Sequence, residues 1–113
     1  MLQHAIRCLG NLSLGNDINK LLIAHEKGVR AVVVTMHSHP RESSLLQQAC
    51  LLLRIIGESD DLKMIIAEEG GLAAVIEVLR NNPRDPALLE FACGCLAALC
   101  ILVAAPPARL GNE

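Results

Sequence analysis

The fold is decided by residues 64–79, which read MIIAEEGGLAAVIEVL. In the second half of this stretch, apolar residues recur at positions i, i+3, i+4 and i+7, namely at Leu72, Val75, Ile76 and Leu79. This spacing predicts a helix with one apolar face. Gly70 and Gly71 separate it from a shorter helical segment that comes before. A similar arrangement stands 43 positions earlier, where residues 21–36 read LLIAHEKGVRAVVVTM.

The same offset of 43 residues aligns much of the chain with itself. It matches Ile23 with Ile66, Gly28 with Gly71, Pro40-Arg41 with Pro83-Arg84, Leu45-Leu46 with Leu88-Leu89, and Ala49-Cys50 with Ala92-Cys93. The first residues of the chain also align with a later segment, but at an offset one residue longer. Ala5, Leu9 and Leu12 then match Ala49, Leu53 and Ile56. A period of about 40 to 47 residues is typical of α-helical repeats that stack into a solenoid.

Each repeat is predicted to contain three helices. A short helix is expected over 17–26 and again over 61–69, and a second over 29–37 and 72–80. The third and longest is expected over 2–14, 44–57 and 87–103. The predicted N-caps are Asn16, Ser59-Asp60 and Asp85, and Pro86 suits a first helical turn.

The domain boundaries follow from these helices. Residues 1–103 are expected to form one repeat segment, made of a leading third helix (2–14) and two full repeats (16–57 and 59–103). Residues 104–113 contain Pro106-Pro107 and depart from the repeat, so they are expected to be an irregular tail. This order of helices is the one expected of a fragment or a truncated form of a longer array.

Residues 5–13, AIRCLGNLS, resemble the third-helix pattern Ala-Ala-x-Ala-Leu-x-Asn-Leu-Ser of the armadillo repeat family, and residues 71–79 resemble its second-helix pattern. HEAT repeats are the nearest alternative, but the separate short helix and the glycine before the second helix favour armadillo. The resemblance implies an all-α protein folded as a right-handed α-α superhelix. It also implies that the third helices line a concave groove that binds protein partners.

The resemblance can be followed position by position. The asparagine that holds a ligand backbone in peptide-binding members falls on Asn11, then on Ile55, then on Ala98. The tryptophan position falls on Arg7, Leu51 and Gly94. Only Asn11 is retained and the chain has no Trp, so the peptide-clamping ladder of nuclear-import members is absent.

The candidate groove residues are polar, basic or apolar side chains of the predicted third helices: Arg7, Asn11, Gln47, Gln48, Leu51, Arg54 and Ile55. An asparagine amide both donates and accepts, and arginine suits bidentate contacts with carboxylates. The alternative for Asn11, Arg7 and Arg54 is a solvated helix face. Leu51 and Ile55 lie one turn apart and either form an apolar stripe or belong to the core, and one of them is expected to be core.

Other classes of protein are disfavoured by composition. The net charge of −2 provides no basic field for nucleic acid. The uncharged run from Phe91 to Ala105 is shorter than the roughly 20 residues of a membrane helix, so a buried helix is expected. The five cysteines lie in apolar helical stretches, as reduced core thiols do, which indicates a cytoplasmic or nuclear protein.

Catalytic and metal sites are also disfavoured. No phosphate-binding loop, nucleophile elbow or zinc-protease motif occurs, so neither an enzyme nor a cofactor is expected. Cys93, Cys95 and Cys100 are better interpreted as packed core residues than as metal ligands. His37 and His39 are better interpreted as residues of a surface loop. The alternative to a protein-binding groove is an architectural segment that associates with itself through uncapped ends.

Overall fold

The computed structural model describes residues 2–110, and the environment of the side chains for residues 2–100. In this range the chain is all-α, with no strand, as expected from the sequence. Its seven helices are α1 (Leu2–Ser13), α2 (Asp17–His25), α3 (Gly28–Ser38), α4 (Ser43–Ile56), α5 (Asp60–Glu68), α6 (Gly71–Asn81) and α7 (Pro86–Leu110).

The helix boundaries repeat along the chain. The first residues of α2, α3 and α4 are followed 43 positions later by the first residues of α5, α6 and α7. The helices α2 and α5 have 9 residues each, and α3 and α6 have 11 each. The predicted helix bounds are confirmed to within one residue, except at the end of α7.

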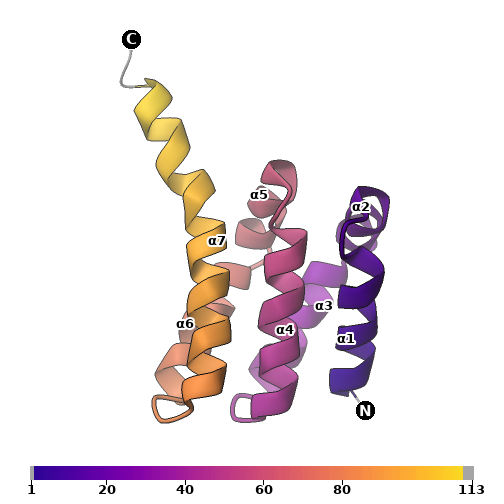
Figure 1. The fold of residues 1–113 in the computed structure, drawn as a ribbon, viewed down its shortest axis with the longest axis vertical. Coiled ribbons are helices and arrows are strands. Elements are labelled where there is room, and N and C mark those ends of the chain that lie inside the picture. Colours follow the sequence, from indigo (N-terminus) through magenta and orange to yellow (C-terminus); the bar gives the residue numbers. More distant parts are fainter. Residues whose placement is uncertain (1, 111–113) are drawn as a thin grey trace.

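The three third helices lie side by side in a row. Figure 1 shows α1, α4 and α7 next to one another, with α3 and α6 behind them. Contacts join α1 to α4 and α4 to α7, and the shorter helices pair in the same order, α2 with α5 and α3 with α6. Because α4 is covered from both sides, it carries much of the core, including Leu46, Ala49, Cys50, Leu52, Leu53 and Ile56, all fully buried.

Each pair of short helices is joined by a tight turn that needs glycine. The turn residues Lys27 and Gly70 have left-handed backbone angles, with φ of 64° and 85°. A Cβ atom added to Gly28 would lie 2.5 Å from Cγ2 of Ile23, and one added to Gly71 would lie 2.5 Å from Cγ2 of Ile66. The glycine and the isoleucine that match at the 43-residue offset therefore meet in space within each repeat.

Two predicted N-caps are present. The Asn16 side chain accepts a hydrogen bond of 3.0 Å from the backbone N–H of Asn19, at the start of α2. The Asp85 carboxylate accepts one of 3.2 Å from the backbone N–H of Leu88, and Pro86 is the first residue of α7. Ser59 stands at the N-cap of α5 but makes no side-chain cap bond.

The end of α7 differs from expectation. The helix continues through Pro106-Pro107 to Leu110, so the prediction of an irregular tail from residue 104 is wrong as far as Leu110. Residues 111–113 lie outside the described part of the chain. Proline fixes φ near the helical value, so a helical backbone is allowed at Pro106-Pro107, although each proline lacks the N–H donor and its ring crowds the carbonyl of residue i−4.

Within the part of the chain that the structure describes, no helix has both the length and the hydropathy needed to cross a bilayer.

Candidate binding face

One side of the row of third helices is open and chemically mixed. After its first residue, α4 has exposed or half-buried positions at Ser44, Gln47, Gln48, Leu51 and Arg54, and each of them lies three or four residues from another. Residues at this spacing share one side of a helix. We call this side, together with the adjoining surfaces of α1 and α7, the row face.

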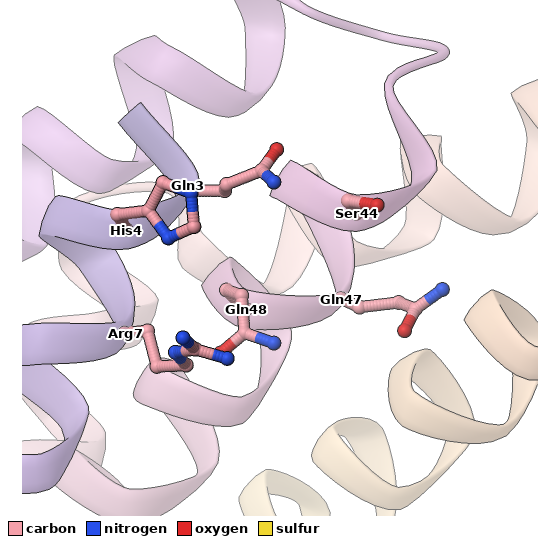
Figure 2. Close-up of a pocket in the computed structure, with 6 residues that line it drawn as sticks. All are labelled: Gln3, His4, Arg7, Ser44, Gln47 and Gln48. Atoms are coloured by element: carbon pink, nitrogen blue, oxygen red, sulfur yellow. The ribbon is translucent and has the colours of Figure 1, made fainter. Parts of the chain in front are cut away.

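A pocket of about 150 Å³ opens on the row face between α1 and α4. It is lined by Gln3, His4 and Arg7 from α1 and by Ser44, Gln47 and Gln48 from α4. In the view of Figure 2 the Gln48 amide of α4 meets the Arg7 guanidinium of α1, with the amide oxygen on the side of Arg7. The structure thus brings together three residues proposed from sequence, namely Arg7, Gln47 and Gln48.

Gln47 differs from Gln48 in its surroundings. Its Nε2 donates a hydrogen bond of 3.0 Å to the hydroxyl oxygen of Ser43, in the first turn of the same helix. In Figure 2 its amide points away from Arg7. Gln48 is therefore the better placed of the two to meet a ligand in the pocket.

Leu51 and Ile55 are told apart by burial. Ile55 is only 6% exposed, and its Cδ1 lies 3.7 Å from the Cβ position of Gly10, at the contact between α1 and α4. Ile55 is therefore a core residue, and its expected place in the binding groove is not confirmed. Leu51 stays half-buried on the row face, next in line after Gln48.

Arg54 connects the row face to α7. Its Nη1 lies 3.5 Å from the Cβ position of Gly94, an ordinary van der Waals separation, so the guanidinium lies against this part of α7. Burial raises the pKa of the nearby Cys95 thiol to about 12, and the positive charge of Arg54 acts in the opposite direction. Arg54 itself is exposed and stays accessible to a partner.

Asn11 lies apart from the pocket. It is exposed on α1, one turn beyond Arg7, and it is not among the residues that line the pocket. It extends the row face along α1 without adding to the polar cluster.

Three pocket residues were missed by sequence reasoning: Gln3, His4 and Ser44. Gln3 and His4 precede Arg7 by one turn, and Ser44 precedes Gln47 and Gln48 by one turn. Continuing the predicted face by one turn toward the start of each helix would have found all three.

The cysteines and histidines considered as metal ligands are dispersed. Cys93 is exposed whereas Cys95 is buried, so their thiols occupy different sides of α7. Nδ1 of His39 contacts the Glu42 carboxylate. In the described residues no group of three or more potential ligands comes together.

Comparison of the chain with known proteins found no matching family model, no similar curated protein and no similar solved structure.

Proposed function

We propose that the chain is a segment of an armadillo-type solenoid, a right-handed α-α superhelix, and that its row face binds a protein partner. The 43-residue offset in helix boundaries and the pairing of equivalent helices support the solenoid. The five free thiols suit a cytoplasmic or nuclear protein. In this proposal the chain supplies a surface and catalyses no reaction.

The row face of α4 is the observation that carries the proposal. This helix is flanked by α1 and α7 and supplies much of the core, yet one side remains accessible. That side presents an amide at Gln48, an apolar surface at Leu51 and a guanidinium at Arg54. Arginine is enriched in protein interfaces and among the residues that carry most of the binding energy.

Peptide selection against the immobilised full chain tests the proposal. Peptides enriched from a random display library are synthesised, and their affinities are measured by fluorescence polarisation. The double variant Asn11→Ala with Arg54→Glu should weaken binding by about tenfold or more, since a charge-assisted contact is lost and a repulsive charge is added.

A matched variant supplies the control for this experiment. Asn81→Ala with Arg30→Glu makes the same chemical changes at exposed positions of α6 and α3, outside the row. Its affinities should equal those of the unmodified chain. The proposal fails if the two double variants bind the selected peptides equally well.

A second function, an architectural segment that associates with itself, is favoured by the surface around α1 and α2. Large apolar side chains are exposed there, at Leu2, Leu12, Leu14, Ile18, Leu21 and Leu22. Leu2 and Leu12 match Leu46 and Ile56 in the next repeat, and both of these are fully buried. The outer side of α1 is thus as apolar as a helix surface that is buried against a neighbouring helix.

The occupant that fits this surface is a second copy of the chain, through the outer side of its α7. Cys93, Ala97 and Cys100 are exposed there at positions i, i+4 and i+7, and their small side chains allow close approach of a helix. Joining α7 of one copy to α1 of the next continues the row that α1, α4 and α7 already form. Such a head-to-tail contact uses two different surfaces, so it leads to open, concentration-dependent assembly.

Sedimentation over a range of concentrations tests self-association. Leu12→Glu should shift the chain toward monomer. Met64→Glu, at a side chain of similar exposure on α5 (56% against 55%), should leave the distribution unchanged. A chain that is monomeric at all concentrations would rule out this second function.

A further inference from the structure

We infer that the pocket between α1 and α4 binds an anionic group of a partner peptide, a carboxylate or a phosphate. This inference rests on the proposed function and specifies the chemistry of the ligand. It would add to the row face a defined site for one acidic side chain.

Every side chain that lines the pocket can donate a hydrogen bond, and Arg7 can only donate. Arg7 contributes a guanidinium, His4 an imidazole, Ser44 a hydroxyl, and Gln3, Gln47 and Gln48 contribute amides. None of the six is a carboxylate. Because a guanidinium is always charged and presents a planar fork of donors, an oxyanion is the group best matched to it.

The position of the donors supports the same ligand. Arg7 and Gln48 reach the pocket from two different helices, so an anion bound in the pocket would bridge α1 and α4 (Figure 2). Gln3, His4 and Ser44 also belong to the first turns of α1 and α4, where the helix dipole adds a small positive potential to that of the side chains.

The nearest acidic side chain in sequence is engaged elsewhere. Glu42 lines a neighbouring hollow with Leu2, Gln3 and Leu45 rather than this pocket. Its carboxylate contacts Nδ1 of His39. The Arg7 guanidinium is therefore open to an anion supplied from outside the chain.

The size of the pocket limits the ligand. A volume of about 150 Å³ accommodates a carboxylate or phosphate group together with bound waters. Leu51 follows Gln48 by one turn on the same face, so an apolar side chain beside the anion would find a surface there. The site thus suits an acidic residue within a peptide better than a free nucleotide.

Nuclear magnetic resonance titration of the labelled full chain tests the inference. The probes are two capped tetrapeptides, Ala-Glu-Glu-Ala and its neutral counterpart Ala-Gln-Gln-Ala, and inorganic phosphate as a separate arm. The acidic peptide should shift the side-chain amide signals of Gln3 and Gln48 and the Nε signal of Arg7. The neutral peptide should bind about tenfold more weakly or not at all.

Two variants separate a specific contact from general charge. Arg7→Gln should reduce the affinity for the acidic peptide by about tenfold or more, because it removes the one permanently charged donor of the pocket. Arg30→Gln removes an exposed arginine from α3, a helix outside the row of α1, α4 and α7. This variant should bind the acidic peptide as tightly as the unmodified chain does. Circular dichroism should show unchanged helix content for both.

Each outcome decides a separate point. Shifts by phosphate that disappear in Arg7→Gln support a phosphorylated side chain, and shifts by the glutamate peptide alone support a carboxylate. Equal chemical-shift changes with the neutral peptide, or binding undiminished by Arg7→Gln, would overturn the anionic site. Neither result would contradict the proposal that the row face binds a peptide. No response to either anion would also overturn the anionic site, and library selection then decides the proposed function independently.

Discussion

A Cβ atom placed on Gly71 would lie 2.5 Å from Cγ2 of Ile66 and 2.9 Å from the Ile66 carbonyl oxygen. Neither distance is compatible with an unstrained side chain, and one of the atoms belongs to the backbone. The contact closes the turn between α5 and α6, and the same relationship joins Gly28 to Ile23 in the preceding repeat. The turn depends on glycine because of close approach, since the left-handed backbone angle falls on the residue before it.

Gly71→Ala should therefore lower the free energy of unfolding by about 1 to 3 kcal/mol, the usual cost of forcing extra atoms into a packed site. Urea denaturation followed by circular dichroism measures the change. A variant as stable as the unmodified chain would contradict the close approach.

Gly94→Ala is the matched control. It makes the same change within α7, where the nearest heavy atom to the new Cβ is Nη1 of Arg54 at an ordinary 3.5 Å. Alanine loses less backbone entropy than glycine in a helix, so this variant should be as stable as the parent or more stable by up to about 1 kcal/mol.

The buried ammonium of Lys20 gives a second prediction. Its side chain is 4% exposed, and its Nζ lies 2.8 Å from Oε1 of Glu58, which links α2 to the turn between α4 and α5. Glu58→Gln should lower the free energy of unfolding by about 1 kcal/mol. The loss stays small because Glu58 is 55% exposed and screened by solvent, and because Asp17 remains 3.7 Å from Lys20.

Glu68→Gln, at an exposed position of α5, is the control for that measurement and should leave stability unchanged. If the two glutamine variants are equally stable, the Lys20–Glu58 pair contributes nothing measurable.

The thiols should divide into two classes of reactivity. Cys8, Cys93 and Cys100 are exposed, whereas Cys50 and Cys95 are buried. Iodoacetamide should modify the exposed three in the folded chain and the buried two only after denaturation, because alkylation requires an accessible thiolate. Peptide mass spectrometry identifies the modified sites. Modification of all five at similar rates without denaturant would refute the burial of Cys50 and Cys95.

Stability should fall at alkaline pH. Burial raises the pKa of Cys50 and of Cys95 from 9.0 to about 12. Below pH 9 both thiols are protonated in the folded and the unfolded chain, so their contribution does not vary with pH. Between pH 9 and pH 12 the unfolded chain releases protons that the folded chain retains. The free energy of unfolding should therefore decrease by about 1.4 kcal/mol per pH unit for each thiol.

Two variants test whether the buried thiols cause this decrease in the free energy of unfolding with pH. Cys95→Ala should remove about half of the thiol contribution, whereas Cys93→Ala, at an exposed thiol, should leave the slope intact. Urea denaturation at intervals from pH 8 to pH 11 measures both. Equal slopes for the two variants would show that the buried thiols are not responsible.

The candidate face was only partly predictable from sequence. Arg7, Gln47 and Gln48 were proposed and do meet in one pocket, but Gln3, His4 and Ser44 were not proposed. Their polar character says only that they avoid the core, since a solvated helix face has the same composition. Which of these side chains meet depends on how α1 and α4 lie against each other, and a single helical pattern does not contain that information.

By itself, the sequence determined the helices and their repetition, because glycine turns, caps and apolar spacing act over short distances along the chain. The starts of α2 to α7 could be placed to within one residue from local signals alone. Only the tertiary structure decided that Ile55 belongs to the core and Leu51 to the surface. Because α4 is apolar on nearly all sides, its own periodicity does not indicate which side faces solvent, and the packing of α1 and α7 against it makes that choice.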